Sequence, residues 1–262
     1  MDEKNSREIP PHPEKKPRYD LPLTPRSLAE IFSLCADFEQ RRVLPGLMEG
    51  FGCLTLCWLD GLVDGAAVSE DVLRPLTDAR RVMASSGPAQ LADELERGAA
   101  YACTVRRRKS TDDCVADLLG GSCALIFEPL GEALTFETRT TLSRSVSSPA
   151  VEKAIKGGKD AFVETLRTNT SLVRRRLRTP SLKLEQSVVG RLSGTVVALL
   201  YVEGAAKAET VSRLSARLAE IDIDGLLAAG DLEEYVADSP RSPLPQLIHT
   251  ERPDTFAMHL LD

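Results

Sequence analysis

The segment 157–178, GGKDAFVETLRTNTSLVRRRLR, places an apolar helical stripe beside a dense set of side-chain hydrogen-bond donors. The stripe consists of residues that recur at helical spacing, namely Phe162, Leu166, Thr170, Val173 and Leu177. Residues at this spacing share one face of a helix, so we expect that face to pack against a core. The donors left to reach elsewhere are Arg167, Asn169, Arg174, Arg175, Arg176 and Arg178. The segment therefore predicts a helix that holds something polar.

The run from Arg174 to Arg176 predicts that at least one arginine needs an acidic partner inside the protein. Three consecutive residues of a helix cannot all share one exposed face, so at least one of these arginines is expected to point toward protein. An unpaired guanidinium would be costly there. We hypothesise that Glu251 accepts a bidentate bond from this run and so locks the proline-containing strap 239–254 to the helix.

The residues assigned to this structural or interaction cluster are Arg167, Asn169, Arg174, Arg175, Arg176, Glu203, Glu251, Arg252 and Asp254. Glu203 and Asp254 are further candidate partners for the arginines. The alternative role for the cluster is the binding of a small ligand or a partner subunit. Two more carboxylates, Asp60 and Asp64, bracket the residues GLV and are interpreted as turn-forming and capping residues. They are kept as possible inter-domain or ligand contacts, with acid–base or cation chemistry as the alternative.

Motifs for catalysis and cofactors fail at specific positions. Gly157-Gly158-Lys159 precedes a helix, but a phosphate-binding loop needs a glycine and a hydroxyl residue where Lys153 and Asp160 stand. The sequence has no GxSxG, and its three histidines, at positions 12, 249 and 259, have no evident role as a base. Six cysteines occur without a CxxC pair or a nearby histidine, which argues against zinc. We therefore predict no catalytic residues, no cofactor, no metal site and no enzymatic activity.

Composition and charge narrow the class of protein. The chain has 262 residues, 42% of them apolar and 27% charged, as in ordinary globular proteins. A formal net charge of −6 argues against a nucleic-acid partner. No apolar run approaches the roughly 18 to 20 residues that cross a bilayer, and the N-terminus lacks the apolar core of an export signal. We expect this portion to be soluble and not exported through such a signal.

The expected elements indicate an α/β fold of two small subdomains, each a mixed sheet with flanking helices, joined by a Ser/Thr-rich linker. We predict a flexible leader over 1–25, a first subdomain over 26–138, a linker over 139–149 and a second subdomain over 150–262. In the first subdomain, helices are expected over 27–38, from an N-cap at Ser69, and over 111–119. Its strands are expected over 38–43, 54–63, 101–107, 123–127 and 133–138.

The second subdomain is expected to run helix, strand, strand, helix. Residues 195–202, TVVALLYV, are continuously apolar and β-branched, the pattern of a central strand covered on both faces. Val211, Leu214, Leu218 and Ile221 then repeat at helical spacing. SPRSPLPQ, from Ser239, has three prolines and should run as an extended strap, and DTFAMHLLD starts a last helix.

Several short segments of the sequence resemble those of a known family. Besides the arginine-rich segment, they are SGTVVALLYVEGAA, IDIDGLL, PLPQLIHTERPD and AMHLL, with WLDGLVD and VLRPL in the first half. Together they resemble the soluble N-terminal region of the A subunit of spore germinant receptors, most strongly over 151–261. The first half departs from the family pattern at FGCLTLCWLDGLVD and RRRKSTDD.

The resemblance implies a non-enzymatic signalling protein of the spore inner membrane, with this region on the core side. It implies B and C subunits as partners, self-association through a membrane region that this sequence lacks, and a possible small nutrient ligand. Signal relay, assembly and ligand sensing are its open roles, and two subdomains on a linker suit a hinge. One alternative is an A-like paralogue that acts with the dipicolinate-release channel. The other is a self-contained soluble α/β binding protein or enzyme.

Overall fold

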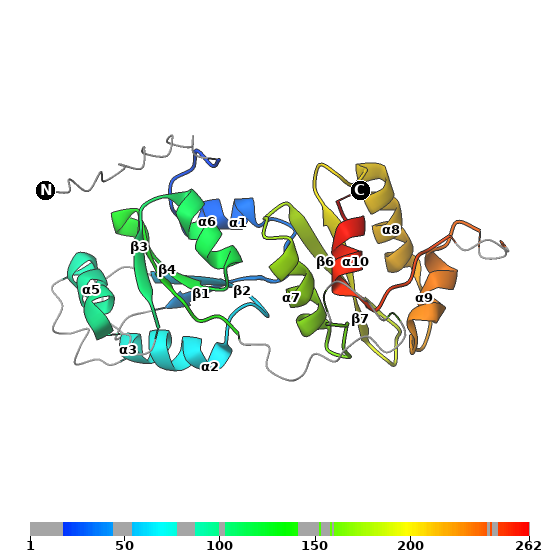
Figure 1. Cartoon of the computed structure of the whole chain (residues 1–262), viewed down its shortest axis with the longest axis horizontal. Helices are drawn as coiled ribbons and strands as arrows, with labels where there is room; N and C mark the ends of the chain where they lie inside the picture. The colour runs from blue at the N-terminus through cyan, green and yellow to red at the C-terminus, as the bar shows by residue number, and fades with distance from the viewer. Residues whose placement is uncertain are drawn as a thin grey trace, which may run out of the picture.

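The protein is described by a computed structural model that covers residues 18–43, 54–77, 87–99, 103–140, 152, 158, 160–239, 242 and 246–261. It is an α/β protein whose two units lie side by side along the long axis (Figure 1). The first unit holds a five-stranded sheet and the second a two-stranded sheet. This confirms the predicted class. The sheets themselves were expected to be mixed, whereas every strand pair within them is antiparallel in the described residues.

The first sheet has the strand order β1-β2-β4-β5-β3. Its strands are β1 (Phe38–Val43), β2 (Leu54–Leu59), β3 (Val105–Arg108), β4 (Cys123–Phe127) and β5 (Glu132–Phe136). All five residues of β4 are buried, because this strand is central in the sheet and helices cover both faces. Since neighbouring side chains of a strand point to opposite faces, Leu125 and Ile126 enter different apolar clusters.

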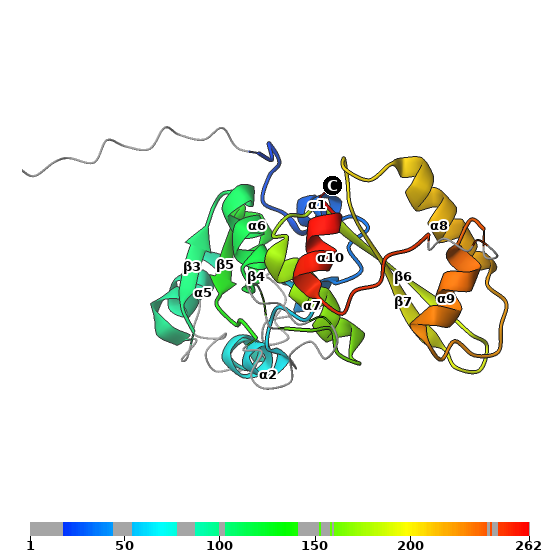
Figure 2. The same ribbon diagram turned by 45° about the vertical axis from the view of Figure 1, so that its right-hand side comes forward.

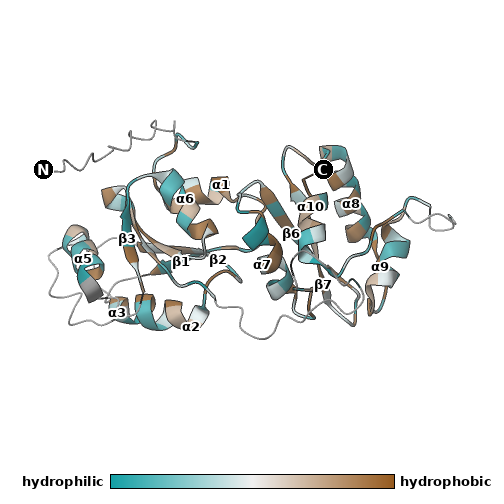
Figure 3. Ribbon diagram, viewed as in Figure 1, coloured by the Kyte–Doolittle hydropathy of each residue, from teal (hydrophilic) through white to brown (hydrophobic). Residues whose placement is uncertain are grey.

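Helices cover the two faces of this sheet, as Figure 1 shows. One face packs on α1 (Pro25–Ile31) and α6 (Thr111–Leu119), through residues such as Leu28 and Leu118. The other face packs on α2 (Gly65–Ala67), which continues through η2 (Val68–Leu73) into α3 (Arg74–Thr77), and on α5 (Pro88–Glu94), which continues into η3 (Leu95–Ala99). A short 3-10 turn, η4 (Glu128–Leu130), joins β4 to β5. In Figure 3 these helices carry both apolar residues, drawn in brown, and hydrophilic residues, drawn in teal.

The second unit is built on the antiparallel hairpin of β6 (Leu182–Val189) and β7 (Thr195–Val202). In Figure 2 the hairpin lies between α7 (Leu166–Arg176) and α10 (Pro253–His259) on one side and α8 (Ala208–Glu220) and α9 (Ala229–Val236) on the other. The expectation of a central strand over 195–202 is wrong. Among the described residues β7 pairs only with β6, and all its side chains remain at least partly exposed. A two-stranded sheet cannot enclose its outer strand.

Helix starts differ from the sequence prediction at two positions. Ser69 was the expected N-cap, but Asp64 caps the helix one turn earlier by accepting hydrogen bonds from Ala66 N and Ala67 N. At the first helix, Thr24 rather than Ser27 is the cap, and Pro25 occupies the first helical position. Proline is well suited there because its fixed φ fits the helix and its missing N–H is not needed.

The predicted linker and leader fall partly within the described residues. Arg139 forms an isolated β-bridge with Val63, and Thr140 N donates to Leu62 O at 2.9 Å. Arg139 and Thr140 therefore belong to the first unit. The rest of the predicted linker, 141–149, lies outside the described residues. Of the leader, 1–17 also lie outside them. Its last part is packed: Leu23 is 3% exposed, and the backbone N–H groups of residues 18 and 19 donate to Asp112.

Among the described helices, none has the length and apolarity that a bilayer span requires.

Candidate functional site

The contact between the two units is centred on one buried ion pair. Arg174 donates to Asp37 through Nε, at 3.0 Å, and through Nη2, at 2.8 Å, while its Nη1 donates to Leu182 O at 2.8 Å and to Thr179 O at 3.2 Å. The side chains of Arg174 and Asp37 are only 1% and 7% exposed. An arginine of the run therefore points into protein, as expected. The partner was predicted wrongly, because the bidentate bond of Arg174 goes to Asp37 of the first unit and not to Glu251.

Backbone hydrogen bonds surround this pair. Residues 34–36 run beside β6 and form a parallel bridge between Cys35 and Leu184. Ala36 N donates to Leu184 O at 2.8 Å, and Leu184 N donates to Leu34 O at 2.9 Å. To make both contacts the chain turns at Leu34, which has a φ of 58°, a region that residues with a side chain seldom adopt. A segment of the first unit thus extends the hairpin of the second.

Two predicted cluster residues, Glu203 and Arg176, make contacts near this junction. Glu203 reaches Lys183, at 3.4 Å, and not an arginine; Lys183 is 3% exposed and also donates to Ser33 O at 3.0 Å. Arg176 donates from Nη2 to both carboxylate oxygens of Asp160, at 2.7 and 2.6 Å. The arginine run therefore spreads its charges in different directions, as helical geometry requires.

The start of α7 lies against a turn of the first unit. Arg167 forms a salt bridge of 2.6 Å with Asp60, which is thus a contact between the units. Gly61 has a φ of 80°, and a Cβ built there would lie 3.0 Å from Arg167 O and 3.1 Å from Ser171 Cβ. Asp64, the other carboxylate of this turn, is occupied in capping α2. A cavity of about 380 Å³ lies between these elements, and Thr140, Thr165 and Thr168 are among its lining residues.

The C-terminal segment lies on the opposite side of α7. Phe162 and Phe256 pack edge to face with ring centroids 5.7 Å apart, and Phe162 N donates to Glu251 O at 2.8 Å. Figures 1 and 2 both place α10 beside α7. The Glu251 carboxylate accepts a hydrogen bond from Glu152 N at 2.8 Å. Arg252 and Asp254, which were expected near the arginine run, pair with each other at 2.6 Å.

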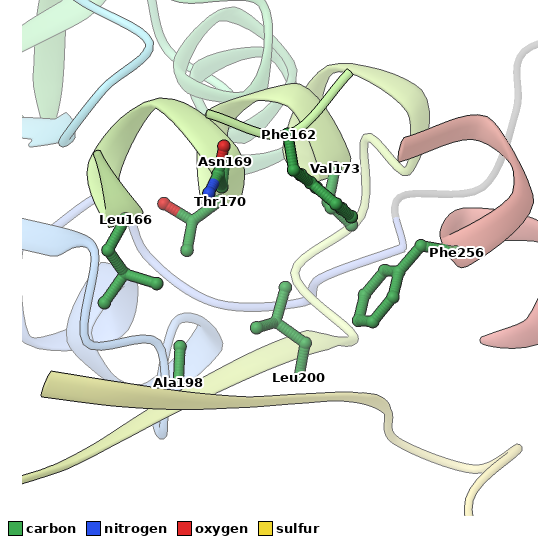
Figure 4. Close-up of a pocket in the computed structure, with 8 residues that line it drawn as sticks. All are labelled: Phe162, Leu166, Asn169, Thr170, Val173, Ala198, Leu200 and Phe256. Atoms are coloured by element: carbon green, nitrogen blue, oxygen red, sulfur yellow. The ribbon is translucent and has the colours of Figure 1, made fainter. Parts of the chain in front are cut away.

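A pocket of about 210 Å³ opens between α7, β7 and α10 (Figure 4). Its lining residues are Phe162, Leu166, Asn169, Thr170, Val173, Ala198, Leu200 and Phe256. Asn169 is its most polar member, and the amide group of that residue is already engaged. It accepts from Val163 N at 2.7 Å and donates to Val163 O at 2.6 Å. The pocket therefore offers apolar contact area and no titratable side chain.

Three buried thiols of the first unit, those of Cys57, Cys114 and Cys123, are poor nucleophiles in their positions. Burial raises the pKa of Cys57 and of Cys123 to about 12, and it also raises the pKa of Cys114. A thiol with such a pKa stays protonated at neutral pH, and the thiolate is the reactive form. Within the described part of the chain, no three His, Cys, Asp or Glu residues gather as metal ligands would.

Sequence reasoning missed Asp37 and Lys183, the acidic and basic groups that complete the junction, and it missed Asp160 as the partner of Arg176. Asp37 follows a helix and precedes a strand, so its local pattern is that of a connecting residue. Its partner lies 137 positions away, and no local periodicity links two such residues. Lys183 alternates with apolar residues at the start of β6, where the strand pattern predicts an exposed side chain; its interior position was unexpected.

A family profile described as Bacillus/Clostridium GerA spore germination protein matches residues 26–262. The chain belongs to the GerA family. Spore germination protein KA of Bacillus subtilis is 30% identical over 80% of this chain and 38% of its own length. Stage V sporulation protein AF of the same organism is 32% identical over 80% of this chain and 42% of its own length. This GerA-family chain therefore spans less than half of these curated relatives.

The fold of this GerA-family chain also has a solved counterpart. It matches the crystal structure of the N-terminal domain of the A subunit of the Bacillus megaterium spore germinant receptor GerK3 with a TM-score of 0.63. The match covers 89% of this chain and 84% of that domain, at 26% identity. Both comparisons confirm the resemblance found in the sequence, and they make this chain a spore germination protein similar to germinant receptor A subunits.

Proposed function

We propose that this chain is the non-enzymatic N-terminal region of a germinant receptor A subunit and that it relays a conformational signal during nutrient-triggered germination. The observation that carries the proposal is the position of α7. One side of this helix is fixed to the first unit through Arg174 and Asp37, and another side packs on the C-terminal helix through Phe162 and Phe256. A displacement of α10 therefore acts on both units through a single helix.

The same contacts favour a relay over a free hinge. Opening the junction would expose a buried ion pair and break the backbone bridge at Cys35 and Leu184. Both interactions would have to break together, so the units are expected to move together or to switch between discrete arrangements. Small displacements would then be transmitted across the protein and not absorbed in a linker.

We further propose that the full-length protein lies in the spore inner membrane, with this region on the core side. It would work with B and C subunits, associate with copies of itself and respond to a small nutrient. Supporting this proposal, one relative is named an uncharacterized membrane protein, YfkQ of Bacillus subtilis, and is 29% identical over 95% of this chain. That relative is about twice as long as the match, which covers 48% of it, so its remaining half has room for membrane helices.

A germination assay tests the relay. The full-length gene carrying Phe256→Ala would replace the native copy, and dipicolinate release after nutrient addition would be recorded. We expect release to slow several-fold at unchanged protein abundance in the spore, because α10 loses its ring contact with Phe162. Tyr235→Ala, at an aromatic side chain that is 45% exposed on α9, serves as the control. Wild-type kinetics of Phe256→Ala spores with normal protein levels would refute the relay.

The A-like paralogue that acts with the dipicolinate-release channel is the second candidate. The observation in its favour is that stage V sporulation protein AF matches this chain as well as spore germination protein KA does, at 32% against 30% identity. Deletion of the gene separates the two. If the chain is part of a receptor subunit, the deletion should abolish the response to one class of nutrient. If it is part of the paralogue, the deletion should slow dipicolinate release for every nutrient alike.

A further inference from the structure

Three arginines meet without a carboxylate where α7 approaches the first unit. They are Arg139, the first residue of the predicted linker, Arg175 in the last turn of α7, and Arg178, two residues beyond the end of that helix. Each is held by a backbone carbonyl oxygen. Arg139 Nε donates to Gly120 O at 2.8 Å, Arg175 Nη2 to Thr140 O at 2.8 Å, and Arg178 Nε to Arg175 O at 3.2 Å. In the described part of the chain, none of the three forms a salt bridge.

The other arginines of α7 show that this arrangement is unusual within the same helix. Arg167, Arg174 and Arg176 each have an aspartate partner, at 2.6, 2.8 and 2.6 Å. Carbonyl oxygens position the guanidinium groups of Arg139, Arg175 and Arg178 but leave their positive charges without an opposite charge. Backbone anchoring of this kind preorganises the donors for an external anion.

The electrostatics of Arg175 support the same conclusion. Burial lowers its pKa, and the positive charges of Arg139 and Arg178 lower it further. Its Nε is buried and has no acceptor among the described residues. A bound anion would add the missing opposite charge to this group. Arg139 and Arg178 are exposed, so an anion can reach the cluster from solvent.

A cavity adjoins the cluster. It measures about 300 Å³, and Arg178, Gly120, Leu119 and Pro180 are among the residues that line it. Gly120 is also the residue whose carbonyl oxygen holds Arg139. The cavity contains one carboxylate, Asp112, which accepts hydrogen bonds from the backbone N–H groups of Arg18 and Tyr19 at 2.8 and 3.2 Å. Asp112 is therefore turned toward the N-terminal segment, although its charge limits how far into the cavity an anion is favoured.

We propose that Arg139, Arg175 and Arg178 form an oxyanion-binding site at the junction of the two units. Its ligand is a phosphate-type group, supplied either by a small free anion or by the headgroup of an acidic phospholipid. This proposal is independent of the proposed relay, because it is argued from the geometry of the three arginines alone. Because Arg139 belongs to the first unit, while Arg175 lies in α7 and Arg178 directly after it, occupation of the site would brace the junction against opening.

Phosphate titration of the 262-residue chain tests this site directly. The probe is inorganic phosphate added at constant ionic strength against sodium chloride, followed through the Nε–Hε NMR signals of the arginines and through the thermal midpoint. Arg175→Gln removes the central guanidinium, and Arg178→Gln removes an exposed one. Arg213→Gln, at an exposed arginine of α8, makes the same change in net charge and serves as the control. A parallel arm uses vesicles of phosphatidylglycerol, compared with phosphatidylcholine.

We expect saturable phosphate binding whose half-saturation concentration rises at least about ten-fold in Arg175→Gln and Arg178→Gln, the loss typical of a charge-assisted bond. In Arg213→Gln it should stay within about two-fold of the unmodified chain. Vesicle binding that depends on Arg175 while free phosphate fails would assign the site to a lipid headgroup. The proposal is overturned if phosphate acts no differently from chloride and vesicle binding is absent or falls equally in Arg213→Gln.

Discussion

Arg174 and Asp37 lie 137 positions apart in the sequence and form a bidentate ion pair that is almost completely buried. The pair joins a helix of the second unit to the segment that leads into β1 of the first. Arg174 also donates hydrogen bonds to the backbone oxygens of Leu182 and Thr179. The stability of the junction should therefore depend on both members being present together.

Arg174→Ala is expected to lower the free energy of unfolding by about 3–5 kcal/mol, because Asp37 would be left buried and unpaired. Urea unfolding of the 262-residue chain measures this loss. Arg213→Ala, at an exposed residue, should change the free energy by no more than about 0.5 kcal/mol.

The double variant Asp37→Leu with Arg174→Met separates packing from charge. Replacing both members of a buried pair by apolar side chains is often neutral or stabilising, so most of the stability lost in Arg174→Ala should return. If the double variant is as unstable as Arg174→Ala, the hydrogen bonds of Arg174 to Thr179 O and Leu182 O, and not its charge pairing, hold the junction.

The sequence predicted the locally determined parts of this fold well. The helix over 111–119 and the strands over 38–43 and 123–127 have the expected bounds, because each carries its own periodic pattern and turn signals. It placed the start of α7 too early, since Asn169 bonds both backbone groups of Val163 and holds the preceding chain outside the helix. Side chains that bond locally to the backbone compete with helix formation in this way, and apolar spacing does not reveal them.

The candidate site was predicted in part for a similar reason. Helical geometry required one arginine of the run to enter the protein, and Arg174 does so. The choice of its partner depends on how the first unit docks on β6, which no residue pattern near Arg174 encodes. Glu251 has an acidic side chain in a suitable segment, but that segment docks on the other side of α7.

Glu251→Ala is expected to destabilise the second unit by about 1 kcal/mol, since Glu152 N loses the carboxylate that accepts its hydrogen bond. The matched control is Glu234→Ala on α9, where the glutamate is exposed. Thermal midpoints of the two variants measure the difference. Equal midpoints would show that the Glu251 carboxylate does not help to hold the strap in place.

Gly61→Ala tests the close approach of α7 to the first unit. The substitution should cost about 1–3 kcal/mol, because an L-residue is strained at a φ of 80° and the new Cβ would lie 3.0 Å from Arg167 O. Gly65→Ala is the control, since no atom lies within 4 Å of a Cβ built there and alanine favours the helix. A Gly61→Ala variant as stable as Gly65→Ala would mean that the two units are not packed against each other at this turn.

Asp117 should contribute to the pH dependence of the protein's folding stability at acidic pH. Burial raises the pKa of this carboxyl, but the hydrogen bonds from Arg108 and Thr135 outweigh burial and leave the pKa below its ordinary value. A carboxylate whose pKa is lower in the folded state stabilises the protein above the unfolded pKa of about 3.9, and this contribution is lost as pH falls through the folded pKa.

Asp117→Asn should therefore be less stable than the unmodified chain at pH 6, and the difference should shrink as the pH falls below about 4. Urea unfolding of both proteins between these values measures the trend. Asp20→Asn, at an exposed aspartate, should run parallel to the unmodified chain throughout. If the difference for Asp117→Asn stays constant with pH, the variant acts by loss of packing and hydrogen bonds alone. The Arg108 pairing would then add nothing to the acid stability of the first unit.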